Sequence, residues 1–232
     1  MALPQQLDAV FLDIGGPIYD DENFVGAVVL ALDDLLAGQS GAPVDRTAVR
    51  AIYQRIRVEQ GGSFRTALAT EILGDATLRD ELARRTEQYW RHPAGTMYAE
   101  VPAFLASMHG AVTVGVLANQ PASVADDLRR DGVAELIDVW GISAIVGHEK
   151  PSRELFDWAL AQAGTTADRA VHIGNRLDND VRPAAALGLG TVWVLRGDAP
   201  PEPTDHQLAE PDLVVDDLTG LADVLLVRGR RR

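Results

Sequence analysis

The 232-residue chain contains no cysteine. This absence excludes disulfide bonds, thiolate metal ligands and cysteine nucleophiles, and it is typical of a cytoplasmic protein. The chain also lacks the basic segment and apolar run of a signal peptide, and no apolar run reaches the roughly 18 residues that a membrane helix needs. We therefore expect a soluble cytoplasmic protein.

Cationic residues are scarce: the chain has 21 Lys and Arg residues and 34 Asp and Glu residues, which gives a net charge of −13. Nucleic acids and anionic membrane surfaces are bound by clustered cations, so this balance argues against both as partners. We expect a small-molecule substrate and make no prediction of oligomeric state.

Lysine is almost absent, because Lys150 is the sole lysine among the 21 cationic residues. Arginine and lysine differ in shape and hydration, and only lysine offers a compact ammonium group. A position that keeps lysine in an arginine-rich chain is therefore a candidate functional position.

Apolar residues, in contrast, are plentiful at 47 % of the chain, which is enough for a substantial core. Short apolar runs bounded by Gly, Asp or Asn predict buried parallel strands at residues 9–14, 111–118, 139–146, 170–174, 191–195 and 213–215. Helical patterns lie between them at residues 121–132, 153–164 and 181–187. This alternation predicts an α/β fold with a doubly wound, Rossmann-like parallel sheet.

Residues 20–92 interrupt this alternation, because they contain no convincing strand. They hold helical patterns that include residues 25–37, 46–60 and 76–90. We interpret residues 20–92 as an all-α cap domain inserted into an α/β core of residues 1–19 and 93–232. An insertion at the carboxyl end of a strand is expected near the edge where open α/β sheets bind ligands.

Polar residues stand at the ends of four predicted strands. The first strand runs into Asp13, the second ends at Ala118 and Asn119, Lys150 precedes the 153–164 helix, and the fourth strand leads into the acidic loop "GNRLDND". Taken singly, the carboxylate reads equally well as a turn residue, and the Asn and Asp residues as helix caps. Together they place a carboxylate, an amide, a lysine and an acidic loop at one edge of the sheet.

These motifs resemble those of the haloacid dehalogenase-like (HAD) superfamily, with a helical cap between the first and second motifs. "FLDIGG" matches the strand that ends on a nucleophilic Asp, "VGVLANQ" the second motif, "EKPSRELF" the lysine motif and "IGNRLDND" the acidic motif. Their order and spacing agree over nearly the whole chain.

The resemblance implies a hydrolase in which Asp13 attacks the substrate and Lys150 neutralises the charge that gathers there. It implies substrate binding by Gly16, Ala118 and Asn119. It also implies Mg²⁺ as a cofactor, held by residues drawn from Asp13, Gly15 (through its carbonyl oxygen), Asn175, Asp178 and Asp180.

Three positions depart from the superfamily's pattern. Gly15 stands where the family's general acid is expected, Ala118 where a Ser or Thr hydroxyl is expected, and Asn175 where an Asp metal ligand is expected. Loss of a general acid typically costs about 10²- to 10⁴-fold in rate. His148 and Asp20 are candidate replacements, and Asn119 could supply the lost hydrogen bond.

Three function classes follow. We favour a phosphatase that acts on a small phosphorylated metabolite through an aspartyl-phosphate on Asp13. The alternative is a metal-independent hydrolase of the 2-haloacid dehalogenase type, which Ala118 does not fit. The cap offers arginines for binding a halide, although such residues also read as a solvated helix face: Arg46, Arg50, Arg55, Arg57 and Arg65. The third is a binding or regulatory protein that has lost turnover.

Overall fold

The computed structural model describes residues 3–37 and 43–228. The chain divides into two compact units, one made of Met1–Asp20 with His92–Arg232 and the other of Asp21–Arg91. We call them the core unit and the helical unit and describe each by itself.

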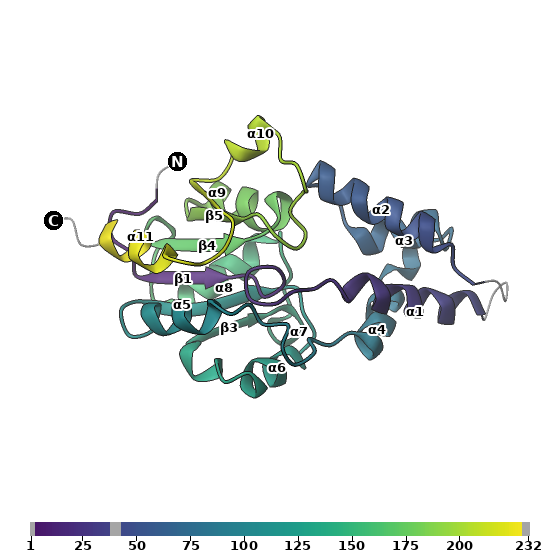
Figure 1. Cartoon of the computed structure of the whole chain (residues 1–232), viewed down its shortest axis with the longest axis horizontal. Coiled ribbons are helices and arrows are strands. Elements are labelled where there is room, and N and C mark those ends of the chain that lie inside the picture. The colour runs from purple at the N-terminus through teal and green to yellow at the C-terminus, as the bar shows by residue number, and fades with distance from the viewer. Residues whose placement is uncertain (1–2, 38–42, 229–232) are drawn as a thin grey trace. The chain divides into compact units, whose positions relative to one another are not determined.

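The core unit contains a six-stranded parallel sheet in the order β3-β2-β1-β4-β5-β6. Figure 1 labels four of these strands, β1, β3, β4 and β5. The strands are β1 (Ala9–Leu12), β2 (Thr113–Ala118), β3 (Val139–Ile142), β4 (Ala170–Gly174), β5 (Gly190–Val194) and β6 (Leu213–Val215). The chain fills the sheet outward from β1 to β3, then returns to the other side of β1. This confirms the predicted α/β doubly wound class and puts the topological switch point, where such sheets bind ligands, between β1 and β4.

Alternating residues of β1 face two different helix layers. Val10 and Leu12 belong to the hydrophobic cluster that includes α5 (Val101–Met108), α6 (Val124–Arg130) and α11 (Leu221–Arg228). Ala9 and Phe11 belong to the cluster that includes α8 (Arg153–Ala163) and α9 (Arg182–Leu187). Because side chains alternate along a strand, β1 is buried on both faces, which explains its unbroken apolar sequence.

The remaining helices of the core unit are short. They are η2 (Ala134–Leu136), α7 (Ser143–Val146), η3 (Ala167–Arg169), η4 (Leu177–Val181, a π-helical turn) and α10 (Asp205–Leu208). Over residues 3–37 and 43–228, no helix combines the length and apolarity that crossing a membrane requires.

The helical unit contains α1 (Phe24–Ala37), α2 (Arg46–Glu59), α3 (Phe64–Glu71), η1 (Ala76–Leu78) and α4 (Arg79–Tyr89). Asp45 caps α2 by accepting from the Thr47 N–H at 2.9 Å, and Ser63 caps α3. Helices α1, α2, α3 and α4 share one hydrophobic cluster that includes Leu32 and Leu68. The unit therefore has its own apolar core.

The predicted strand at residues 139–146 is wrong in its second half. β3 ends at Ile142, and Ser143–Val146 forms α7. Gly147 ends this helix in the left-handed region at φ +83°, a conformation that glycine adopts without strain. A short apolar run does not by itself distinguish a buried strand from a buried helical turn.

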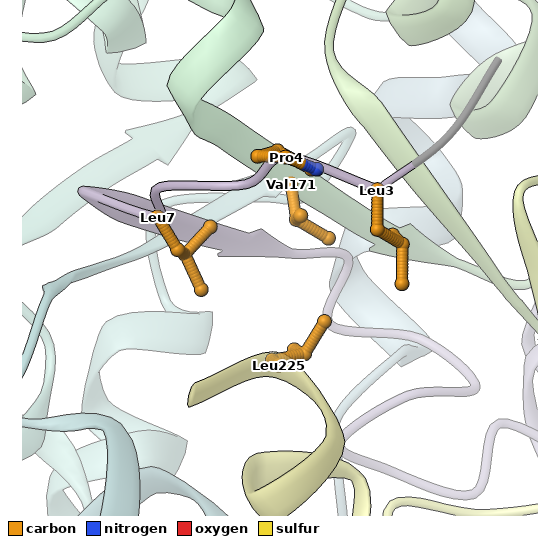
Figure 2. A pocket seen from close by; sticks show the side chains of 5 residues that line it. All are labelled: Leu3, Pro4, Leu7, Val171 and Leu225. Carbon is orange, nitrogen blue, oxygen red and sulfur yellow. The ribbon is translucent and has the colours of Figure 1, made fainter. Parts of the chain in front are cut away.

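One apolar pocket lies at the amino end of the sheet (Figure 2). Its lining residues come from the segment before β1, from the start of β4 and from α11, and they are Leu3, Pro4, Leu7, Val171 and Leu225. All five side chains are apolar, so the pocket offers no side-chain group that could take part in chemistry. It lies at the opposite end of β1 from Asp13.

Candidate active site

Asp13 directly follows β1 at the carboxyl edge of the sheet. Its backbone N–H donates to Ile173 O at 2.8 Å, which continues the pairing of β1 with β4. Its carboxylate accepts from the Ile14 N–H at 2.8 Å, and the side chain is 16 % exposed. Asp13 is therefore held at the switch point with a side chain that is not fully buried.

Lys150 reaches the same place from the loop before α8. Its Nζ lies 2.9 Å from Asp13 Oδ1 and 2.6 Å from Asp180 Oδ1, and its side chain is 2 % exposed. The structure thus brings together the predicted nucleophile, the sole lysine and one predicted acidic residue. A buried ammonium between two carboxylates keeps its charge because both partners favour it.

Asp180 lies in the π-helical turn η4, entirely buried. Its Oδ1 contacts Lys150 Nζ and His172 Nε2, at 2.6 and 3.0 Å, and its Oδ2 accepts from the Arg176 N–H at 3.0 Å. Gly174 makes room for this carboxyl group, because a Cβ there would lie 2.2 Å from Asp180 Cγ. Both oxygens of Asp180 are therefore occupied by protein donors.

Sequence reasoning missed His172. It occupies a central position of β4, where its ring is buried and packs edge-on against Phe156. Burial lowers the pKa of His172, so the ring is neutral and donates its Nε2–H to Asp180. In the sequence, His172 is visible only as one polar residue in an apolar strand, which is a weak indication of function. A buried histidine does require a hydrogen-bond partner.

The two carboxylates that share Lys150 have opposite pKa shifts. Burial raises the pKa of Asp13 to about 7, against the lowering effect of Lys150. Burial also raises the pKa of Asp180, but the charge of Lys150 and the hydrogen bond from His172 outweigh it and leave a lowered value. One ammonium group is shared by two carboxylates, Asp13 and Asp180. As the pH falls, Asp13 is therefore the one of the two that is protonated first.

Asn119 is placed beside Lys150 and bonds to its backbone. Asn119 Nδ2 donates to Lys150 O at 2.7 Å, and the Lys150 N–H donates to Asn119 Oδ1 at 2.7 Å. Ala118, one residue earlier, is fully buried in the hydrophobic cluster under α6. Substrate binding by either residue stays a prediction, and the observed bonds assign the Asn119 amide to positioning the lysine loop.

Asn175 and Gly16 lie against each other. A Cβ on Gly16 would lie 2.1 Å from Asn175 Nδ2, and Gly16 has φ +87°. Asn175 Nδ2 donates to Arg196 O at 3.2 Å, and its backbone carbonyl accepts from Trp193 Nε1 at 3.0 Å. Glycine at position 16 is therefore required both by backbone conformation and by the close approach of Asn175.

Two side chains are candidate replacements for the general acid, and arginines of the helical unit are candidate halide ligands. His148 is exposed. Asp20 is half-buried, and its backbone N–H donates to Thr96 O at 2.9 Å. Arg55 of the helical unit pairs with Glu71. A catalytic role for any of these side chains stays a prediction.

Three of the proposed metal ligands are side chains that follow β4, and each has a feature that disfavours Mg²⁺ binding. Asp178 forms a two-bond ion pair with Arg176, at 2.9 and 2.7 Å, and both oxygens of Asp180 are occupied as described above. Asn175 supplies a neutral amide where a hard cation prefers a carboxylate. Within the described chain, no group of three or more His, Cys, Asp or Glu side chains could hold a metal ion. As they are placed, the side chains of residues 175, 178 and 180 do not fit a Mg²⁺ site.

Comparison with known proteins places this site in a family. Residues 148–221 match the model of the HAD-hydrolase-like family. The chain is 33 % identical over 168 residues to the phosphoserine phosphatase of Thermus thermophilus, which covers 68 % of this chain and 63 % of that enzyme. The chain thus spans somewhat less than two thirds of the length of that relative.

Solved structures with the same fold include both phosphatases and a dehalogenase. A predicted phosphatase from Clostridium acetobutylicum superposes with a TM-score of 0.73 at 17 % identity, covering 96 % of this chain and 99 % of that chain. A 2-haloacid dehalogenase from Pseudomonas syringae superposes with a TM-score of 0.62 at 24 % identity, covering 95 % and 98 %. The chain belongs to the haloacid dehalogenase-like superfamily.

Proposed function

We propose that this protein is a phosphatase that hydrolyses phosphorylated small metabolites through an aspartyl-phosphate on Asp13. The observation that carries the proposal is the bridge that Lys150 Nζ makes between Asp13 and Asp180 at the switch point of the sheet. The similarity to a phosphoserine phosphatase supports phosphorus as the atom attacked.

In the first step, a carboxylate oxygen of Asp13 attacks phosphorus, the Asp13 O–P bond forms, and the bond from phosphorus to the leaving group breaks. Oδ1 is engaged by Lys150 and the Ile14 N–H, so Oδ2 is the oxygen assigned to attack. In the second step, a water oxygen attacks phosphorus, the Asp13 O–P bond breaks, and the Asp13 carboxylate is restored; the protons of the water leave with the phosphate product or to solvent.

Lys150 contributes electrostatically in both steps. Negative charge gathers around phosphorus in the transition state, and a fixed ammonium in a buried site stabilises it without reorganisation. Asp180 holds Lys150 in place, and His172 and the Arg176 N–H in turn hold the Asp180 carboxylate. We assign these groups to positioning, because they contact the lysine or its partner and not the nucleophile itself.

Gly15 restricts the substrates that this scheme handles well. Without a side-chain acid two residues after the nucleophile, the leaving group departs without a proton from that position. Substrates whose leaving groups are weak bases, such as acyl phosphates and aryl phosphates, need that proton least. We therefore propose that phosphoryl anhydrides and esters of acidic alcohols react faster than simple alkyl esters.

Phosphatases of this superfamily generally use Mg²⁺. Use of Mg²⁺ by this chain stays a prediction, because the side chains of residues 175, 178 and 180 do not fit the ion as they are placed. A second candidate function is hydrolysis at carbon, in which an ester forms on Asp13 and a halide ion leaves without a proton. The neutral Asn175 and the absence of a side chain at Gly15 favour this candidate, because it needs neither a metal ligand nor a general acid at these positions.

One set of assays separates these functions. Phosphate release is measured from acetyl phosphate, p-nitrophenyl phosphate and a panel of phosphorylated metabolites, with Mg²⁺ or with EDTA, and chloride release is measured from 2-chloropropionate. The proposal expects phosphate release that Asp13→Asn abolishes, and no chloride. Chloride release without phosphate release would replace it with the second candidate. Saturable ligand binding without any turnover would favour a regulatory protein.

A further inference from the structure

The loop after Asp13 is folded tightly although it is not a regular element. The Ile18 and Tyr19 N–H groups both donate to Ile14 O at 3.0 Å, and the Gly16 N–H donates to Tyr19 O at 2.8 Å. Ile14 is also the residue whose N–H donates to the Asp13 carboxylate. The conformation of this loop therefore sets the orientation of the nucleophile.

The carbonyl groups of this loop are held by Arg196, which the sequence presents only as part of an Arg-Gly-Asp loop after the fifth predicted strand. Arg196 Nε donates to Gly16 O at 2.7 Å, and its Nη2 donates to Pro17 O at 2.6 Å. Two parallel donors on adjacent carbonyls match the planar fork of a guanidinium group, which an ammonium cannot reproduce.

Arg196 is itself fixed from other directions. Its Nη1 donates to Glu100 Oε1 at 2.6 Å, and its Cζ lies 3.6 Å from the ring centroid of Tyr98. Its backbone carbonyl accepts from Asn175 Nδ2, and its side chain is 13 % exposed. A side chain with this many constraints can transmit its position to the loop it contacts.

We propose that Arg196 is a positioning residue for catalysis: it clamps the Gly16 and Pro17 carbonyl groups and thereby holds the loop that orients Asp13. This inference rests on the proposed function, because the reaction at Asp13 is what the clamp would serve. Ile14 links the clamped loop to the Asp13 carboxylate, so loosening the loop would displace the nucleophile and lower the rate. Misplacement of a reacting group by about 1 Å can cost roughly 10²-fold in rate.

The test compares Arg196→Ala and Arg196→Lys with a matched control, Arg169→Ala. Arg169 donates through Nη2 to Asp8 Oδ1 at 2.7 Å, just before β1 begins and so at the other end of that strand. Two readouts are used: kcat and KM for p-nitrophenyl phosphate, and hydrogen–deuterium exchange of the Gly16, Ile18 and Tyr19 amides. The exchange readout does not depend on any activity.

In Arg196→Ala we expect kcat to fall about 10²-fold with KM changed by less than about threefold, and the loop amides to exchange faster. Arg196→Lys is expected to show a smaller loss, because it keeps the charge but not the two-carbonyl geometry. Arg169→Ala is expected to lower the melting temperature without either effect. If Arg196→Ala does not fold, Glu100→Gln loosens the same guanidinium and is expected to reduce kcat in the same direction.

Unchanged exchange of the loop amides in a folded Arg196 variant would overturn the clamp, whatever the activity. Faster exchange with unchanged kcat, or an equal loss of kcat in Arg169→Ala, would overturn its catalytic role. If the wild-type protein releases no phosphate from any substrate, the proposed function and the catalytic role both fail, while the exchange measurement still decides whether Arg196 holds the loop.

Discussion

Asn119 holds the backbone of Lys150 from both sides, with hydrogen bonds of 2.7 Å to its N–H and 2.7 Å to its C=O. A side-chain amide offers one donor group and one acceptor at the spacing that a backbone residue presents. The carboxyl end of β2 is thereby tied to the loop that delivers the ammonium group. The Asn119 side chain therefore has a structural role that does not depend on a hydroxyl group at residue 118.

Asn119→Asp tests this relationship. The new carboxylate oxygen would face Lys150 O, where an N–H now donates, so we expect the protein to lose about 1 to 3 kcal/mol of unfolding free energy and part of its kcat. Urea denaturation and initial rates measure the two effects. Asn23→Asp is the matched control, because exposed Asn23 also donates to a backbone carbonyl, that of Arg91, at 2.8 Å. Equal effects in both variants would contradict the assignment.

The raised pKa of Asp13 predicts a pH-dependent stability difference. The pKa of Asp13 is about 7 in the folded protein and near its ordinary value of 3.8 when unfolded, so between these values the folded state binds more protons. The stability of the wild-type protein then falls as pH rises through this window. The Asp13→Asn variant lacks the titrating group. The melting temperature of Asp13→Asn minus that of wild type should therefore become more positive from pH 4 to pH 8. A constant or decreasing difference would contradict the shift.

Gly15→Asp is expected to improve turnover of poor leaving groups. Gly15 is not among the residues with positive φ, so its backbone conformation accepts a side chain. An acid at this position would protonate the leaving oxygen, which is typically worth about 10² to 10⁴ in rate. We expect kcat for alkyl phosphates to rise while kcat for acetyl phosphate changes little. Gly15→Ala controls for the added bulk, and an equal gain in that variant would refute the proton-donor interpretation.

Asn175→Asp tests the missing metal ligand. The variant places an acceptor where Asn175 Nδ2 donates to Arg196 O at 3.2 Å, so it should be less stable than wild type when no divalent cation is present. Mg²⁺ prefers a carboxylate at this position and should restore part of that stability. We expect Mg²⁺ to raise the melting temperature of Asn175→Asp more than that of Asn175→Ala. An equal response would show that residue 175 does not contact the ion.

Much of the fold could be predicted because buried parallel strands have unbroken apolar sequences. The strand at residues 170–174 is confirmed residue for residue, whereas the strand predicted at 139–146 ends at Ile142 because the apolar run continues into a helical turn. Helices α5 and α11 were not predicted, although each packs an apolar face on the core.

The candidate site was predictable where strand ends carry unusual residues. Asp13, Lys150 and Asp180 come together because three motifs end at one edge of the sheet. Arg196 was not predicted, because its role depends on contacts between residues distant in sequence: Arg196 lies 180 positions from Gly16. No local pattern encodes such a contact. His172 was not predicted for a different reason: its partner Asp180 is near in sequence, but one polar residue in an apolar strand does not reveal which group it contacts.

We propose that Asp13 carries the phosphoryl group during turnover, and acid quenching followed by mass spectrometry detects that group on the protein itself. The protein is mixed with acetyl phosphate or p-nitrophenyl phosphate, quenched during turnover and digested. We predict one added phosphoryl group on the peptide that contains Asp13, and neither that group nor phosphate release in Asp13→Asn. Phosphate release that continues undiminished in Asp13→Asn, with no phosphoryl group on the Asp13 peptide of the wild-type protein, would show that Asp13 is not the nucleophile.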